Sequence, residues 1–191
     1  MHTLIRAAAL TLALQQAAMV TAELAAQGNG GPAGPTNPAC ALVTEKEVES
    51  ATGLDYWPGW AGEASIPGEA RCHWGGPGGG LSATGEVVRD YKPAIAVILI
   101  ADSPRGNYTE WQRKQQLPRG CTREPVRVGG EDAFAEFCEQ PQYKASVYAR
   151  AGSRDVIVGV YYGETKGWPK ASVKPAAIAL AKVAVARAKG E

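Results

Sequence analysis

The stretch from Tyr143 to Tyr162 alternates between apolar and polar residues, which predicts two β-strands. In the first strand, one face carries Tyr143, Ala145, Val147, Ala149 and Ala151, and the other carries Lys144, Ser146, Tyr148 and Arg150. In the second strand, one face carries Val156, Val158, Val160 and Tyr162, and the other carries Ile157, Gly159 and Tyr161. We expect this second strand to be covered on both sides. Gly152-Ser153 supplies a tight reversal between the two strands, so the pattern predicts an antiparallel hairpin.

Three further segments have the pattern of strands. Residues 94–101 are apolar throughout and rich in β-branched side chains, which predicts a central strand buried on both faces. In residues 71–74, alternation predicts that Cys72 and Trp74 point inward and His73 outward. A turn at 128–134 leads into a third strand, which we expect at 133–139.

Three helices complete the predicted fold. Thr44 and Glu47 have the spacing of a capping box, and Gly53 ends that short helix. Asn107 caps a second helix, which ends before Pro118. Residues 170–189 form an Ala-rich helix with one stripe facing the sheet, made of Val173, Ala177, Leu180, Ala181 and Ala184. The expected class is α+β: a single antiparallel sheet with a short N-terminal helix, a middle helix and a long C-terminal helix packed on it.

Composition and the N-terminus predict export. The chain has 191 residues, 45% hydrophobic residues and a formal net charge of +1, which suits one globular domain and argues against nucleic acid as a partner. Arg6 precedes a short apolar run, so we expect a signal peptide at 1–26, with cleavage after 22 or after 26. An Ala-rich amphipathic helix of the fold is the alternative. A Gly/Pro-rich linker is expected at 27–39, and the domain at 40–191.

The four cysteines agree with export. Cys40, Cys72, Cys121 and Cys138 all follow the predicted cleavage point, and none lies in a C-x-x-C pair of the zinc-binding type. We expect two disulfides, and the spacing leaves all three pairings open; free buried thiols are the alternative. Cys40 lacks the context of a lipidation site, and no later apolar run is long enough to span a membrane. The expected protein is periplasmic or secreted, and soluble rather than lipid-anchored.

Candidate binding residues are few. Trp57 and Trp60 flank a Pro-Gly turn that brings the indoles together, either as a stacking surface for a sugar or aromatic ring or as an edge of the core. His73 is the one histidine after the leader and is expected at the surface. Basic residues dominate 105–127, and acids dominate 131–139. This division either attracts an anionic envelope polymer or is an ordinary solvated surface.

No catalytic constellation is evident. A single histidine after the expected signal peptide, oxidised cysteines and the lack of a G-x-S-x-G elbow leave no nucleophile with its base. We expect no catalytic residue, no metal site and no cofactor. The alternative is a carboxylate-dependent hydrolase of wall glycans that uses Glu131 with Asp132, or Glu136 with Glu139.

Several motifs occur in an order that resembles a known family. These are Cys40-Ala41-Leu42-Val43-Thr44 with Glu47-Val48, then Cys72-His73-Trp74, then Val128-Gly129-Gly130-Glu131-Asp132-Ala133. The chain resembles small exported bacterial cell-envelope proteins, many of them lipoproteins, that carry a domain of unknown function. The resemblance spans about residues 38–188 and implies a compact α+β domain with a disulfide from Cys40 to Cys72. It brings no catalytic residues. The expected function is therefore a non-catalytic module that binds an envelope ligand or protein partner.

Overall fold

The structure is a computed structural model of the full chain. It describes residues 37–56, 58–77, 80–81, 87–88, 91–101, 103–129, 131–140, 142–162 and 168–190. The expected signal peptide, most of the expected linker and Trp57 lie outside the described residues. Everything below concerns the unit that begins at Pro32.

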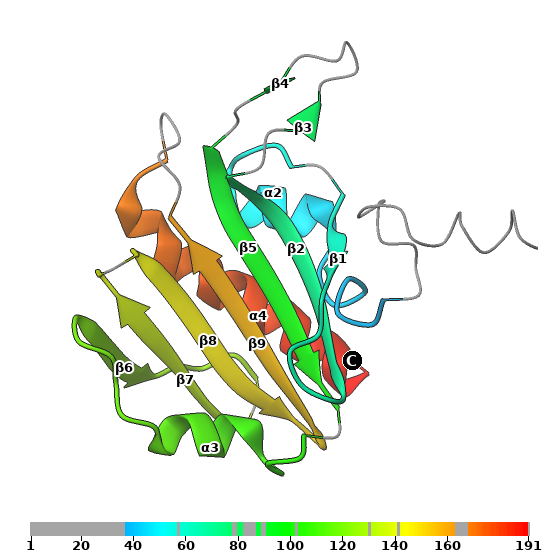
Figure 1. Ribbon diagram of the computed structural model, residues 1–191, viewed down its shortest axis with the longest axis vertical. Helices are drawn as coiled ribbons and strands as arrows, with labels where there is room; N and C mark the ends of the chain where they lie inside the picture. Colours follow the sequence, from blue (N-terminus) through cyan, green and yellow to red (C-terminus); the bar gives the residue numbers. More distant parts are fainter. Residues whose placement is uncertain are drawn as a thin grey trace, which may run out of the picture. The chain divides into compact units, whose positions relative to one another are not determined.

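A seven-stranded antiparallel sheet is the centre of the fold (Figure 1). Its strands follow the spatial order β1 (Trp60–Gly62), β2 (Glu69–Pro77), β5 (Tyr91–Ile100), β9 (Arg154–Tyr161), β8 (Lys144–Ala151), β7 (Glu131–Cys138) and β6 (Cys121–Pro125). A separate two-stranded sheet pairs β3 (Gly80–Leu81) with β4 (Val87–Val88). The expectation of one antiparallel sheet therefore holds for the main body, and the small second sheet is an addition to it.

The predicted hairpin is confirmed and lies in the middle of the sheet. β8 and β9 pair from Ala151 opposite Arg154 to Lys144 opposite Tyr161, and Gly152 adopts a positive φ of 63° in the turn. β9 also pairs with β5, so its backbone is hydrogen-bonded on both edges. Residues 155–160 are all buried, as expected for a strand covered on both faces. β5 is the apolar strand predicted at 94–101, and it begins three residues earlier.

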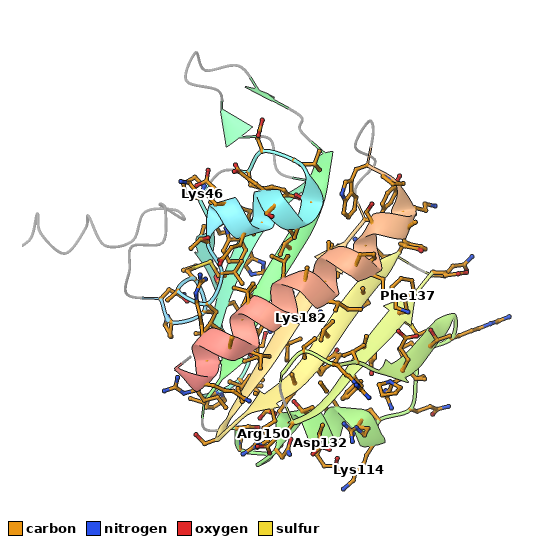
Figure 2. All side chains as sticks on the ribbon, turned by 180° about the vertical axis from the view of Figure 1, so that it is seen from behind. Lys46, Lys114, Asp132, Phe137, Arg150 and Lys182 are labelled. Carbon is orange, nitrogen blue, oxygen red and sulfur yellow. A yellow bond between two sulfur atoms is a disulfide. The ribbon has the colours of Figure 1, made fainter. Side chains whose placement is uncertain are left out.

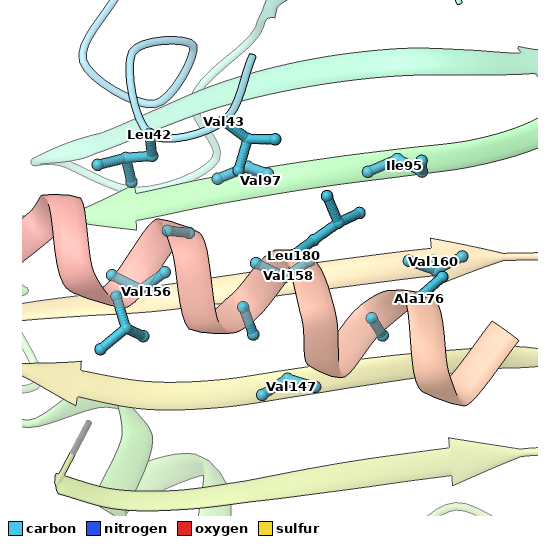
Figure 3. Packing of buried hydrophobic residues seen from close by; sticks show 14 of the residues in the cluster. Leu42, Val43, Ile95, Val97, Val147, Val156, Val158, Val160, Ala176 and Leu180 are labelled. Carbon is cyan, nitrogen blue, oxygen red and sulfur yellow. The ribbon is translucent and has the colours of Figure 1, made fainter. Parts of the chain in front are cut away.

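The long C-terminal helix α4 (Val173–Lys189) packs along one face of the sheet against β8 and β9 (Figure 2). A single 3-10 turn, η2 (Lys170–Ser172), precedes it. Every residue of the predicted stripe is buried, and Figure 3 shows Leu180 and Ala176 above Val156, Val158 and Val160. Alanines at the contact keep the helix backbone close to the strands, because a methyl group adds little thickness.

The short helix α2 (Glu45–Thr52) is joined to α4 by an ion pair. Glu47 accepts hydrogen bonds from the backbone N–H and the hydroxyl of Thr44, both at 2.8 Å, and pairs with Arg187 at 2.6 Å. Burial alone would raise the pKa of Glu47, but the hydrogen bonds from Arg187 and Thr44 outweigh it and lower the pKa. Gly53 ends the helix with φ 72°, as predicted.

Two disulfides are present, Cys40–Cys72 and Cys121–Cys138, so the structure selects one of the three possible pairings. The first is the bond that the family resemblance implied. The folded region begins before Cys40: Ala39 is fully buried, and the Asn37 amide donates to the carbonyl of Arg71 at 3.1 Å. The last residues of the expected linker 27–39 therefore belong to the domain.

Candidate ligand-binding face

The second face of the sheet has only one described helix over it. Figure 1 is viewed towards this face, with the short helix α3 (Tyr108–Lys114) across one end, near β7 and β8. The Asp155 carboxylate, at the start of β9, accepts the backbone N–H groups of Tyr108 and Thr109 at 3.1 and 2.9 Å. Asn107 accepts the next N–H, that of Glu110. The first turn of α3 is thus fixed to the sheet by a carboxylate from a distant strand.

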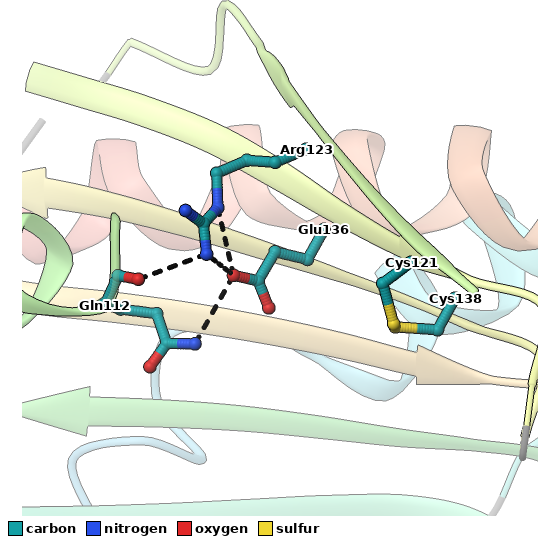
Figure 4. Close-up of a disulfide and its surroundings, with 5 residues drawn as sticks. All are labelled: Gln112, Cys121, Arg123, Glu136 and Cys138. Carbon is teal, nitrogen blue, oxygen red and sulfur yellow. Dashed lines mark hydrogen bonds and ion pairs between the residues drawn. A yellow bond between two sulfur atoms is a disulfide. The ribbon is translucent and has the colours of Figure 1, made fainter. Parts of the chain in front are cut away.

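The other end of α3 is held by Arg123 of β6 (Figure 4). Its guanidinium donates to the carbonyl oxygens of Gln112, Arg113 and Gln115 at the end of the helix, where the regular helical hydrogen bonds run out. The same guanidinium pairs with Glu136 of β7 at 2.6 Å, and Gln112 also donates to Glu136. Both ends of α3 therefore contact this face of the sheet through charged groups, which fixes where Tyr108 lies.

A row of cross-strand neighbours crosses the middle of this face. Register places these residues side by side: His73, Ala96, Gly159, Ser146, Glu136 and Arg123. The central three are small, and larger side chains on the flanking rows lie over them. The Tyr161 ring lies against Gly159, where an added Cβ would come within 3.1 Å of it. A short central row overlain by large polar side chains is the main geometric feature of this face.

We call the five residues Arg71, His73, Tyr108, Tyr148 and Tyr161 the tyrosine face. The strand register puts Arg71, His73, Tyr148 and Tyr161 on one face of the sheet, and the hydrogen bonds to Asp155 place Tyr108 of α3 on the same side. Burial raises the pKa of all three phenols, most of all that of Tyr148. The three tyrosines are therefore neutral hydrogen-bond donors throughout the physiological range.

The Arg71 side chain is held in place by Glu69 and by the turn that precedes β2. Its guanidinium pairs with Glu69 and donates to the Ser65 hydroxyl at 2.7 Å. Glu69 in turn accepts the backbone N–H groups of Ser65 and Ile66 at 3.1 and 3.2 Å, in the turn between β1 and β2. A guanidinium fixed in this way loses little conformational entropy when it binds an anion.

Trp60 and His73 lie together beside the tyrosine face. They are cross-strand neighbours on β1 and β2, with ring centroids 6.0 Å apart, and both are half-buried. Trp57 lies outside the described residues, so its predicted meeting with Trp60 stays a prediction. Burial, with the Arg71 charge as the smaller cause, lowers the pKa of His73, and the imidazole is therefore neutral at pH 7. Cys72 and Trp74 point inward and His73 outward, as the alternation predicted.

The carboxylates proposed for the alternative hydrolase have structural partners. Glu136 pairs with Arg123, and Asp132, with a positive φ of 53°, pairs with Arg113. Glu131 and Glu139 are exposed near opposite ends of β7. Within the described parts of the chain, no group of three or more His, Cys, Asp or Glu residues is placed to hold a metal ion.

A second aromatic group lies beside α4, on the covered face. Tyr162 stacks on Trp168 at 6.1 Å and meets Tyr143 edge-on at 6.2 Å, and Tyr143 contacts Phe137. The ammonium of Lys170 lies over the rings of both Tyr143 and Tyr162. Trp168 is buried, and Tyr143 and Tyr162 pack against the hydrophobic core, so the group is better explained as the end of the core than as a binding surface.

No protein-family model, curated protein or solved structure matches this chain. In the part of the chain that the structure describes, no helix has the length and apolarity needed to cross a membrane.

Sequence reasoning did not identify most of the tyrosine face. Of its five residues only His73 was a candidate; Tyr148 and Tyr161 were placed only on the sides of their strands, and Arg71 lay in the predicted strand 71–74 without an assigned side. A signal was present: in a tight hairpin the register is set by the turn, so Ser146 must lie opposite Gly159, and Tyr148 and Tyr161 must share one face. The contribution of Tyr108 depends on Asp155, which is 47 residues away, and no local pattern indicates it.

Proposed function

We propose that this protein is an exported envelope module without catalytic activity, and that it binds a ligand or partner through the tyrosine face. The observation that carries the proposal is the placement of three tyrosines and one fixed guanidinium on a sheet face with a single described helix over one end. Two disulfides and the resemblance to exported envelope proteins support the same compartment.

The composition of this face favours binding over a purely structural role. Tyr and Arg are enriched where proteins recognise partners, because they combine apolar area with hydrogen-bond donors at low entropic cost. A sheet face used only for packing would carry aliphatic residues, as the α4 side does. The acids of this face are paired with arginines, which favours binding over carboxylate catalysis.

The test is an amide chemical-shift titration of the full chain, with both disulfides formed. Wall polysaccharide, lipid and envelope protein are added as separate fractions. We expect one fraction to shift amides of β2, β8 and β9 around Arg71, Tyr148 and Tyr161. Tyr161→Ala should remove most of that response, whereas Tyr143→Ala, a matched half-buried tyrosine on the opposite face, should retain it.

Three outcomes would contradict this function. One is no response to any fraction, and another is a response that maps to α4. The third is the appearance of cleaved glycan fragments with a rate that falls in Glu136→Gln, which would establish the hydrolase instead. Circular dichroism of both tyrosine variants confirms that they are folded before the titrations are compared.

A further inference from the structure

Charges on the tyrosine-face side of the sheet are layered by depth. Three of its acids, Glu69, Glu136 and Asp155, have side chains that are 3%, 9% and 1% exposed. Their arginine partners, Arg71, Arg123 and Arg150, are 28%, 16% and 23% exposed. In these three pairs the negative charge lies beneath the surface and the positive charge lies nearer the solvent; at the α3 end, Glu110 and Asp132 are more exposed and are paired with Lys114 and Arg113.

Lys144 adds a cation to this layer. It is half-buried at the end of β8, opposite Tyr161, and its ammonium lies 5.7 Å from the centre of that ring. Arg105 adds another at the α3 end, stacked 3.9 Å from the centre of the Trp111 ring. Solvent therefore meets guanidinium, ammonium and neutral phenol groups on this face, a combination that complements an anion.

The aliphatic residues of this face offer little area to a hydrocarbon chain. Ile157 is 8% exposed and Ile100 is 2% exposed, and Ile98, between Arg71 and Ile157 in the register, is half-buried. A lipid bilayer or an apolar peptide needs a broad exposed aliphatic patch, which these residues do not form. Half-buried aromatic rings with hydroxyl and guanidinium donors suit a ligand that has its own hydroxyls and short apolar ring faces.

Resting on the proposed function, we infer that the ligand of the tyrosine face is an acidic glycan, with one sugar carboxylate or phosphate paired with Arg71, another paired with Lys144, and a sugar ring packed against Tyr161. Glu69 and Ser65 hold the Arg71 guanidinium in place for this contact. The neutral hydroxyls of Tyr108 and Tyr161 donate to the remaining sugar oxygens. Tight binding needs several such units, because each single contact is weak in water.

Titration calorimetry of the full chain with four probes tests this inference. The probes are polygalacturonate, a poly(glycerol phosphate) chain, neutral dextran and phosphatidylglycerol vesicles. We expect one or both anionic polymers to bind, with an affinity that falls as salt rises, and we expect dextran and vesicles not to bind. Arg71→Gln should weaken binding by about tenfold or more, and Lys144→Gln by about threefold.

Lys182→Gln is the matched control, because it removes one exposed cation from α4, on the far side of the sheet (Figure 2). It should change affinity by less than about twofold. Arg71→Gln leaves the buried Glu69 without its partner and can unfold the domain. In that case the result for Lys144→Gln decides, because Lys144 forms no ion pair with any residue that the structure describes. Loss of affinity in Lys182→Gln equal to that in Lys144→Gln would overturn the inference.

The remaining outcomes separate this inference from the function on which it rests. If dextran and polygalacturonate bind equally well, the protein is still a glycan-binding module, but the inference that its ligand must be acidic is wrong. If only the phosphatidylglycerol vesicles bind, the ligand is a lipid and the inference of a glycan is wrong. If no probe binds while an envelope protein fraction still shifts the tyrosine face, the inference fails and the function stands. If neither experiment gives a response, both fail.

Discussion

The two faces of the central sheet are built from the same strands and are chemically opposite. β9 gives Val156, Val158 and Val160 to the face under α4, and it gives Asp155, Ile157, Gly159 and Tyr161 to the other. β8 divides in the same way, with alanines and Val147 beneath the helix and Ser146, Tyr148 and Arg150 opposite. Because strand side chains alternate, one segment can stabilise the fold on one side and place polar groups on the other.

This difference teaches that the polar groups of the tyrosine face are not there to form the main core. The covered face buries its aliphatic side chains against α4 and against Leu42, Val43 and Val48, and the loss of this core would unfold the domain. Ion pairs on the opposite face contribute less, since desolvation offsets much of their attraction. Substitutions on the two faces should therefore separate stability from binding.

The largest effect is expected from the disulfides, one of which belongs to each face. Cys40→Ser with Cys72→Ser should lower the free energy of unfolding by about 4 kcal/mol, and Cys121→Ser with Cys138→Ser by about 3 kcal/mol. The first bond closes a loop with a sequence separation of 32 and the second one of 17, so the first restricts the unfolded chain more. Urea unfolding measures both. A larger loss from the Cys121–Cys138 pair would contradict this order.

The next effect compares single side chains. Leu180→Ala removes a 1% exposed side chain between α4 and the sheet, and should cost about 3 kcal/mol through lost burial and a cavity. Lys144→Ala, on the tyrosine face, should cost less than about 0.5 kcal/mol. Thermal unfolding of both variants checks the contrast. Equal losses would show that the tyrosine face is part of the stabilising core after all.

A third prediction concerns the contact between α3 and the sheet. Asp155→Ala removes the acceptor for the N–H groups of Tyr108 and Thr109 and the partner of Arg150, and should cost about 2 kcal/mol. Hydrogen exchange should quicken at the first turn of α3 while β5 keeps its protection. If exchange in α3 were unchanged, Asp155 would not hold this helix. Asp155→Asn keeps an acceptor oxygen, so it should lower the free energy of unfolding by less than Asp155→Ala does.

The sequence was sufficient for those elements whose signals are local. Alternation located the 143–162 hairpin, and the spacing of Thr44 and Glu47 located α2. The stripe on α4 could be predicted because small apolar residues recur at helical spacing. In each case the residues that define the element lie within a few positions of one another, so the local sequence is enough to predict it.

Elements that depend on distant partners could not be predicted. β6 contains Arg123, Glu124 and Pro125 and has no apolar alternation; its place follows from pairing with β7. β1 is only three residues long. The candidate site was found only in part for the same reason: Arg71 is positioned by Glu69 and Ser65, and Tyr108 by a carboxylate from β9. Cysteine pairing likewise needs spatial proximity, which spacing alone does not give.

The tyrosine face should also lose stability at alkaline pH, with no such effect near pH 7. Burial raises the folded-state pKa of Tyr108, Tyr148 and Tyr161 above the ordinary value near 10. A group with a raised folded pKa contributes stability that is complete below its unfolded pKa and is lost as the pH rises towards its folded pKa. Stability should therefore be flat up to about pH 9.5 and then fall, by at most about 1.4 kcal/mol per pH unit for each tyrosine.

Tyr148→Phe isolates one of these contributions, because phenylalanine keeps the ring that stacks on Phe134 at 4.9 Å and removes the ionisable oxygen. At pH 7 the variant should be slightly less stable, since the Ser146 hydroxyl loses its hydrogen-bond partner. Above pH 10 the free energy of unfolding of the variant should fall less steeply than that of the wild type. When the values from urea unfolding are plotted against pH, the two curves should therefore converge. Parallel curves would mean that Tyr148 ionises as easily in the folded protein as in the unfolded chain. The phenol would then lie in open water, and this face would be an ordinary solvated surface with no preformed site.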